Sequence, residues 1–156
     1  MVRIVGMGEL VVTDKEEDIL RTFALASCVA VTVYSPERKT AGMIHVVLPF
    51  PLDSKDRKER PGYFAETGIP LLIDKMCNEY RCRKEELLIH MYGGADSMRN
   101  HDIYRVGNKN IDAVKNILMK MGLPVCKADL RGNESRSLVM EVKTGSVEVY
   151  RQPLMA

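Results

Sequence analysis

The sequence lacks several features that would point to a familiar class of protein. It has no tryptophan, and its 23 basic residues barely exceed its 21 acidic ones. A net charge of +2 does not favour nucleic-acid binding driven by overall charge. No apolar run approaches the roughly 20 residues that a membrane-spanning helix needs. The first residues show no cleavage pattern of a signal peptide, so we expect a cytoplasmic protein.

The cysteines also lack the spacing of a metal site. Cys28, Cys77, Cys82 and Cys126 form no Cys-x-x-Cys pair and have no closely spaced histidine, which argues against zinc. In a reducing compartment all four are expected to be free thiols, and most free thiols are buried and inert. The basic segment DSKDRKER is interpreted as a solvated loop.

What the sequence does contain is a mixture of strand and helix patterns that fits one domain of 156 residues. Strands are expected at residues 2–12, 29–34, 40–49, 86–95, 124–129, 137–142 and 146–151. Helices are expected at residues 63–80 and 111–121, the second capped by Asn110 and ended by Gly122. Residues 16–20 and 50–62 are interpreted as loops. Six or seven strands and two main helices predict an α+β layered domain.

Cys28 begins the strongest strand pattern, CVAVTVY. If the following SPER forms a four-residue hairpin loop, Tyr34 pairs with Lys39 on the returning strand. The same register then places Cys28 opposite His45, and directly opposed residues share a face of the sheet. An imidazole so placed could take the thiol proton and lower the thiol pKa. A register shift of one residue would place the two on opposite faces.

Spacing alone leaves two interpretations of this pair open. A cysteine in a strand is most often a small core residue, and a histidine in MIHVVLP is more often a hydrogen-bonded structural residue than a catalyst. The alternative is nucleophilic thiol chemistry with His45 as the base. His90 and His101 have no cysteine close in the sequence and are interpreted as structural or surface residues.

Several motifs, taken in their order, resemble a known family. The stretch LASCVAVTVYSPERKTAGMIHVVLP is similar to the signature of the chemoreceptor glutamine deamidases, the CheD family of bacterial and archaeal chemotaxis. The resemblance continues through VGMGELVV, PGYFAETGIPLLID, YGGADSM, VGNKNIDAVKNIL and DLRGNESRSL, and so covers nearly the whole chain. It implies an α+β fold over residues 1–156, a single-domain layered α/β/β sandwich with two packed β-sheets and two main helices. That fold is similar to the catalytic domain of cytotoxic necrotizing factor, a cysteine hydrolase.

Carried over position by position, the resemblance implies a catalytic cysteine at Cys28 and a catalytic histidine at His45. The family's third member, a threonine shortly before the cysteine, falls on Thr22. The residues alone favour a loop threonine bonded to its own backbone, whereas the resemblance favours a hydroxyl that orients His45. Ser27 is either an orienting group or a turn residue. Backbone N–H groups near Ser27 and Cys28 are the expected oxyanion donors.

Two positions depart from the family pattern. Ala26 stands where the family usually has a glycine before Ser-Cys, and Arg131-Gly132-Asn133 stands where it usually has two glycines before the asparagine. A methyl group at Ala26 disfavours a positive φ more firmly than glycine would. The turn beside the nucleophile and the level of activity therefore depend on the conformation of this residue.

The resemblance implies hydrolysis of glutamine side chains on methyl-accepting chemotaxis receptors. Cys28 would attack the amide carbon while His45 moves the proton, ammonia would leave, and water would hydrolyse the thioester to glutamate. The family also implies receptor glutamyl methylesterase activity, binding of a CheC-type phosphatase, and no metal or organic cofactor. The loop at 50–62 and the YGGADSM turn are the expected contact surfaces. We expect a monomer or a heterodimer with its partner, with no nucleic acid bound and no membrane insertion.

Two other functions stay open as alternatives. The first is a weakly active or inactive binding module on the same fold that regulates a CheC-type phosphatase, for which Ala26 is the one hint in the sequence. The second is a general cysteine hydrolase that acts on small amides. Intact Cys28 and His45 favour the deamidase over the binding module.

Overall fold

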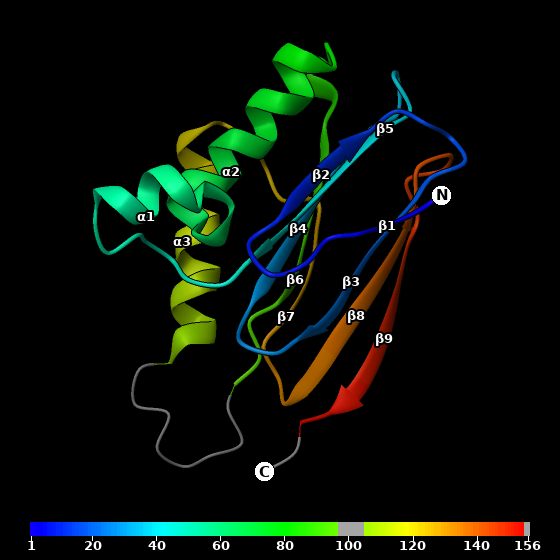
Figure 1. Cartoon of the computed structure of the whole chain (residues 1–156). Helices are drawn as coiled ribbons and strands as arrows, with labels where there is room; N and C mark the ends of the chain where they lie inside the picture. Colours follow the sequence, from blue (N-terminus) through cyan, green and yellow to red (C-terminus); the bar gives the residue numbers. More distant parts are fainter. Residues whose placement is uncertain (97–104, 155–156) are drawn as a thin grey trace.

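The computed structural model describes residues 1–96 and 105–154, and these residues form a layer of helices and two β-sheets (Figure 1). The larger sheet has five strands in the order β2-β5-β4-β6-β7, and the smaller has four in the order β1-β3-β8-β9. The strands are β1 (Val2–Ile4), β2 (Leu10–Thr13), β3 (Ile19–Leu25), β4 (Val29–Ser35), β5 (Thr40–Val46), β6 (Leu88–Gly93), β7 (Lys127–Leu130), β8 (Glu134–Glu141) and β9 (Val147–Pro153). The expected α+β sandwich of helices and two packed sheets is confirmed.

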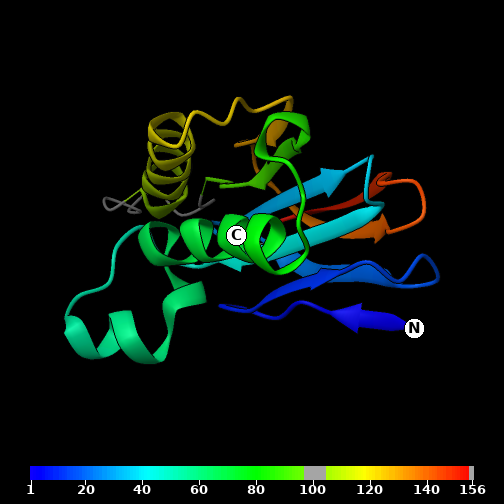
Figure 2. The ribbon, with the colours of Figure 1, turned by 90° about the horizontal axis from the view of Figure 1, so that it is seen from above.

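The helices gather on one side of the strands, as the view from above shows (Figure 2). They are α1 (Ser54–Glu59), α2 (Ala65–Asp74) and α3 (Val106–Lys120), with 3-10 turns at Pro61–Tyr63 and Lys84–Glu86 and a π-helical turn at Lys75–Glu79. A first apolar core lies between α2, α3 and the five-stranded sheet. Its buried members include Val31, Ile69, Leu72, Ile111 and Val114. Burial of these side chains attaches the helices to the sheet.

A second core lies between the two sheets. Successive side chains of a strand point to opposite faces, so Val29, Val31 and Val33 of β4 face the helices, while Ala30 and Tyr34 face the four-stranded sheet. The second core also contains Leu20 of β3, Met43 of β5 and Leu138 of β8. An even-numbered residue at the start of β4 and an odd-numbered residue of β5 therefore point into the space between the sheets.

One strand prediction and one loop prediction near the N-terminus were wrong in detail. The strand expected at 2–12 is split into β1 and β2, which belong to different sheets and are joined by the loop at 5–9. The loop expected at 16–20 overlaps β3, which begins at Ile19 and pairs with both β1 and β8. β3 escaped notice because its outward face exposes Phe23, and because its pairing with β8 shifts register between Thr22 and Leu25. The split of the first strand and the addition of β3 raise the number of strands from the seven expected to nine within the described residues.

Both expected helices are present with different bounds, α2 at Ala65–Asp74 and α3 at Val106–Lys120, but α1 was not expected. α1 lies inside the loop expected at 50–62 and begins at the N-cap Asp53, whose side chain accepts a hydrogen bond from the N–H of Asp56. α3 begins at Val106, four residues before the expected cap, so Asn110 lies within the helix and is buried. Gly122, with a positive φ of 73°, follows the helix as expected.

The hairpin between β4 and β5 has a register different from the expected one. Its last pair is Ser35 with Thr40, so the four loop residues are PERK rather than SPER, and Ala30 lies opposite His45. Ser35 stays in the strand because its hydroxyl donates to the carboxylate of Glu86 and accepts from the N–H of Arg38. The register is therefore shifted by two residues. A shift of two preserves the faces, so Cys28 and His45 still point to the same side of the sheet.

Candidate functional site

Three side chains singled out in the sequence meet at one end of the space between the sheets. Cys28 lies one residue before β4, His45 lies near the end of β5, and Thr22 comes from β3 of the opposite sheet. Thr22 is fully buried, His45 is 3% exposed, and Cys28 is partly exposed beside the inter-sheet core. The thiol is therefore the one member of the three that solvent reaches appreciably.

Cys28 and His45 are diagonal neighbours across the β4–β5 pair rather than direct partners. Ala30 occupies the position opposite His45, and Cys28 lies two residues before it on the same face. Diagonal neighbours are about 7–8 Å apart, a separation that long or aromatic side chains can bridge. Within residues 1–96 and 105–154, the thiol and the ring share no hydrogen bond, and Nε2 of His45 is buried without a partner. An imidazole reaching along this diagonal has a free nitrogen to offer the thiol.

The tautomer of His45 follows from the hydrogen bonds of Thr22. The Oγ1 atom of Thr22 lies 2.7 Å from Nδ1 of His45 and donates to the carbonyl of Val5, also at 2.7 Å. A carbonyl oxygen can only accept, and a hydroxyl has one proton. Thr22 must therefore accept from Nδ1–H of His45. In the neutral ring, Nε2 then has the lone pair, which is the form a general base needs.

The backbone of His45 is fixed by the loop that also provides the Val5 carbonyl. The N–H of Gly8 donates to the carbonyl of His45 at 2.8 Å, and the N–H of His45 donates to the carbonyl of Glu9 at 3.1 Å. Val5 itself donates its N–H to the carbonyl of Arg21, the residue before Thr22. One short N-terminal loop thus holds the backbone of His45 and also provides the carbonyl that accepts from Thr22.

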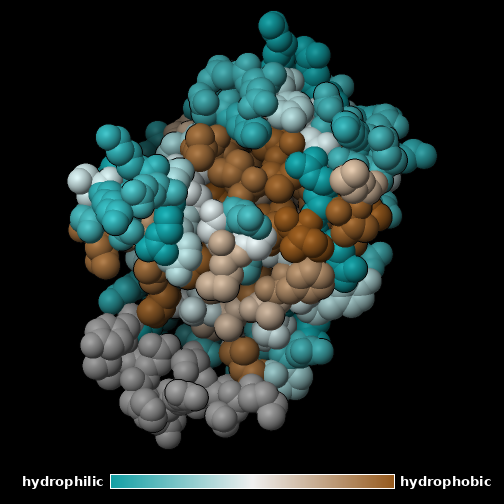
Figure 3. All heavy atoms as spheres, in the orientation of Figure 1, coloured by the Kyte–Doolittle hydropathy of each residue, from teal (hydrophilic) through white to brown (hydrophobic). Residues whose placement is uncertain are grey.

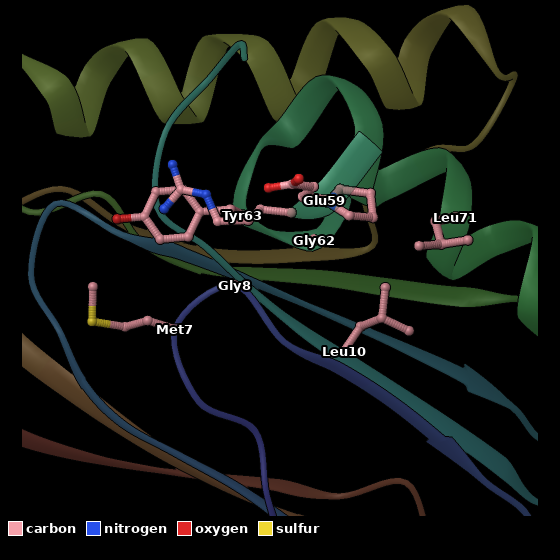
Figure 4. A pocket seen from close by; sticks show the side chains of 9 residues that line it. Met7, Gly8, Leu10, Glu59, Gly62, Tyr63 and Leu71 are labelled. Atoms are coloured by element: carbon pink, nitrogen blue, oxygen red, sulfur yellow. The ribbon is translucent and has the colours of Figure 1, made fainter. Parts of the chain in front are cut away.

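The same loop forms one wall of a hollow of about 310 Å³ (Figure 4). Met7, Gly8 and Leu10 line it from the N-terminal segment, and Tyr63 and Leu71 line it from the helical side. On the face that carries α2 and β2, Figure 3 shows a broad apolar area. The residues that line this hollow do not include Cys28, His45 or Thr22, so it is separate from the candidate site.

Burial shifts the pKa values of the thiol and the ring in opposite directions. It raises the pKa of Cys28 to about 11 and lowers the pKa of His45 to about 4, because both charged forms lose hydration. At neutral pH the pair is therefore a thiol beside a neutral imidazole. The sequence-based expectation was the opposite, a lowered pKa of the thiol. That expectation depended on a charged imidazolium, which burial of His45 disfavours.

The backbone around Cys28 is held by the chain that follows β6. Gly94 donates its N–H to the carbonyl of Cys28 at 2.8 Å, and Ala95 donates to the carbonyl of Ala26 at 2.7 Å. Gly93 has φ of 108°, and a Cβ added there would lie 2.3 Å from the carbonyl oxygen of Cys28. Only glycine allows this approach. The Gly-Gly pair of the YGGADSM motif therefore supports the backbone of Cys28 from the neighbouring strand.

Ser27 and Asn110 complete this part of the site. The side-chain amide of Asn110 donates to the carbonyls of Ser27 and Val47, both at 2.9 Å. Ser27 takes part through its backbone carbonyl, and its hydroxyl makes no hydrogen bond to the described residues. Sequence reasoning missed Asn110 as a site residue. The available indication was a polar residue on the same helical face as Ile111 and Val114, both of which are buried.

The two departures from the family pattern have different consequences. Ala26 does not have a positive φ, so its methyl group fits without strain; the positive φ in this segment belongs to Ala24, at 54°. Arg131 has φ of 67°, a conformation that glycine would adopt more easily. It is held there by its N–H, which donates to the carbonyl of Gly93, and by its own carbonyl, which accepts from Arg136.

Cys77, Cys82, Cys126 and His90 lie apart from this site. Cys77, Cys82 and Cys126 are free, and His90 is 3.2 Å from the hydroxyl of Tyr92. His101 and the last two residues of YGGADSM lie outside the described residues. Among residues 1–96 and 105–154, no group of three or more His, Cys, Asp or Glu side chains could hold a metal ion. Within the same ranges, no helix is long and apolar enough to cross a membrane.

A layered sandwich that brings together a thiol, an imidazole and an orienting hydroxyl has the arrangement of a cysteine hydrolase. Comparison with known proteins identifies the family. The family model described as CheD chemotactic sensory transduction matches residues 47–151, more than half of the chain. The chain belongs to the CheD family.

Individual relatives extend this match toward the N-terminus. Three are named probable chemoreceptor glutamine deamidase CheD or CheD 1. They come from Syntrophotalea carbinolica (42% identical, covering 94% of this chain and 91% of the relative), Syntrophus aciditrophicus (37%, 94% and 91%) and Methanococcus maripaludis (37%, 96% and 94%). Matches over so much of a 156-residue chain must include residues 22–45, which the family model does not reach.

A solved structure resembles the fold alone. The hypothetical protein YfiH of Bacillus licheniformis superposes with a TM-score of 0.52 at 14% sequence identity. The superposition covers 79% of this chain and 49% of YfiH. It supports the layered architecture and carries no information about the reaction.

Proposed function

We propose that this protein deamidates glutamine side chains of chemoreceptors, with Cys28 as nucleophile, His45 as general base and acid, and Thr22 as the residue that orients His45. The observation that carries the proposal is the hydrogen-bond chain from His45 through Thr22 to Val5, which leaves the lone pair of Nε2 without a partner. Cys28 lies on the same face of the sheet. The substrate class comes from the names of the relatives.

In this mechanism the proton and the new bond move together. The Sγ atom of Cys28 bonds to the glutamine side-chain carbonyl carbon while the thiol proton passes to Nε2 of His45. No free thiolate therefore has to form before the attack. Thr22 stabilises the imidazolium by accepting from Nδ1–H. His45 then returns the proton to the amide nitrogen, ammonia leaves, and water cleaves the thioester to give glutamate and the free thiol. Each proton transfer of this kind contributes about 10²–10⁴ in rate.

The direct test is incubation of a purified chemoreceptor cytoplasmic fragment with the protein, followed by peptide mass spectrometry and an assay of released ammonia. The wild type should convert defined glutamines to glutamate, and Cys28→Ala should convert none. Cys126→Ala is the matched control, because Cys126 is an exposed free thiol away from the site. Conversion by Cys28→Ala would overturn the proposal. Binding of the fragment without conversion by the wild type would favour the binding module.

The segment after β5 is the proposed contact surface for the receptor. Phe50 is 55% exposed and Leu52 is 87% exposed. They border an open hollow of about 810 Å³ between this segment and α3. Leu48 also lines the hollow and directly follows Val47, whose carbonyl accepts from Asn110. An apolar rim beside a shallow site suits a helical rod that inserts one side chain. Phe50→Ser with Leu52→Ser should raise KM for the receptor fragment without changing alkylation of Cys28.

Three finer points belong to the same proposal. The acyl-enzyme route also serves receptor glutamyl methyl esters, since an alkoxide leaves more readily than an amide nitrogen, and methanol release by the wild type but not Cys28→Ala would test this. A CheC-type phosphatase is proposed as a binding partner, to be tested by co-elution of the two proteins. Residues 1–156 are proposed to act as a single domain in the cytoplasm, as a monomer or in a heterodimer with that partner.

A further inference from the structure

Asn110 is a buried polar residue that the mechanism above does not use. It is 0% exposed, although it lies on a helix whose other buried side chains are mostly apolar. Its two hydrogen bonds go to carbonyl oxygens, which can only accept, so its NH₂ group must face Ser27 and Val47. Its Oδ1 atom is buried and has no partner among the residues that the structure describes. The residue therefore acts in this structure through its two N–H donors.

One of those donors completes a set of three hydrogen bonds to consecutive backbone carbonyls that end at Cys28. The consecutive carbonyls of Ala26, Ser27 and Cys28 accept hydrogen bonds from Ala95, Asn110 and Gly94, at 2.7, 2.9 and 2.8 Å. Each bond fixes the plane of one peptide group. No hydrogen bond from the N–H of Ser27 or Cys28 to another residue occurs within residues 1–96 and 105–154.

We propose that Asn110 is a positioning residue that aims the N–H of Cys28 at the oxyanion of the tetrahedral intermediate. The peptide bond between Ser27 and Cys28 is trans, so its C=O and N–H point in opposite directions. Because Asn110 holds the Ser27 carbonyl toward α3, the N–H of Cys28 points away from α3. The inference rests on the proposed function, since an oxyanion forms only if Cys28 attacks a carbonyl carbon.

Two observations support this direction. Burial raises the pKa of the Cys28 thiol, and the backbone N–H of the same residue offsets part of that rise, so this N–H lies beside the sulfur that would hold the substrate carbon. The second bond of Asn110 fixes the carbonyl of Val47, just after β5. One side chain thus links the segment of the nucleophile to the end of the strand that carries His45, and holds the donor and the base in register.

The test separates two reactions of the same thiol. Deamidation passes through an oxyanion, whereas alkylation of Cys28 by iodoacetamide displaces iodide and forms none. Asn110→Ala should lower kcat for deamidation of the receptor fragment by about 10- to 100-fold, less than the roughly 10²–10³ that follows removal of an oxyanion donor itself. KM and the alkylation rate at pH 9 should stay within about twofold of wild type, since neither depends on the oxyanion donor. Lys115→Ala is the matched control, because Lys115 is exposed on the same helix and does not line the hollow proposed for the receptor.

Equal losses of alkylation and deamidation in Asn110→Ala would overturn the inference, because they would show a general disturbance of Cys28. Unchanged deamidation in that variant would also overturn it. If Asn110→Ala does not fold, Asn110→Asp keeps the side-chain volume but, when ionised, donates no hydrogen bond, and the same split between the two reactions is expected. Failure of the wild type to deamidate would overturn the proposed function itself, which distinguishes the two results.

Discussion

The two buried layers of this protein differ in what they contain. The core between the helices and the five-stranded sheet is built from aliphatic side chains such as Leu72 and Ile111. The layer between the two sheets has an apolar core as well, but at one end it also buries Thr22 and His45. Burying a polar group without a hydrogen bond is costly, and Nε2 of His45 is such a group. The helix-covered layer is thus mainly apolar, although Oδ1 of Asn110 on α3 is also buried without a partner in the described residues. We infer that this layer mainly provides stability, while the inter-sheet layer bears the cost of an unpaired ring nitrogen at the candidate site.

The largest expected effect comes from removing the base in the inter-sheet layer. His45→Gln should lower the deamidation rate by about 10²–10⁴, because it removes the group that accepts and returns the thiol proton. His90→Gln is the matched control, since His90 lies near Tyr92 and away from the thiol. The rates are measured by ammonia release from the receptor fragment. Near wild-type activity in His45→Gln would contradict the assignment of the base.

A cavity in the helix-covered core should affect stability instead. Leu72→Ala is expected to lower the free energy of unfolding by about 2–5 kcal/mol, the usual result of truncating a buried leucine. Denaturant unfolding measures the loss, and turnover per folded molecule should remain unchanged. If turnover per folded molecule falls with stability, the two layers are coupled and the division between them is wrong.

The pH dependence of stability tests the cost of burying His45. Its pKa is about 4 in the folded protein and near 6.5 when unfolded. The folded state thus binds fewer protons between these values, and its stability is complete above pH 6.5 and falls as the pH drops toward 4. The difference corresponds to roughly 3 kcal/mol. Unfolding of wild type and His45→Gln from pH 7 to 4 should show a steeper loss in the wild type, whereas parallel curves would contradict the lowered pKa.

The smallest effect should come from the residue that orients His45. Thr22→Val removes the acceptor of Nδ1–H and should lower the deamidation rate about tenfold, in line with the 1–3 kcal/mol lost when a buried donor is left unpaired. Thr22→Ser keeps the hydroxyl and should retain most of the activity. Equal losses in both variants would indicate that the methyl group, rather than the hydrogen bond, matters.

The sequence predicted those parts of the fold that have strong local patterns. β4 is a run of β-branched residues, and α3 places Ile111, Val114 and Leu118 at helical spacing, so both were found near their true positions. β3 was missed because an exposed Phe23 and a break in register hide its alternation. The loop between β4 and β5 was misplaced by one residue because a distant partner, Glu86, holds Ser35 in the strand.

The site was predicted in part for similar reasons. Cys28 and His45 could be placed on one face because a two-residue error in register does not change faces. The role of Thr22 depended on the family resemblance, since the contact with His45 joins two sheets. The supporting bond from Asn110 and the direction of the pKa shifts depend on tertiary packing and burial. Neither can be obtained from local sequence.

The central claim is that Thr22 holds neutral His45 with its proton on Nδ1, so that Nε2 is the free base. Nitrogen-15 NMR of the labelled imidazole at pH 7 tests this directly, because protonated and unprotonated ring nitrogens have well-separated chemical shifts. The account predicts a protonated Nδ1 and an unprotonated Nε2 for His45, with loss of this preference in Thr22→Val. A proton on Nε2 in the wild-type protein would contradict it.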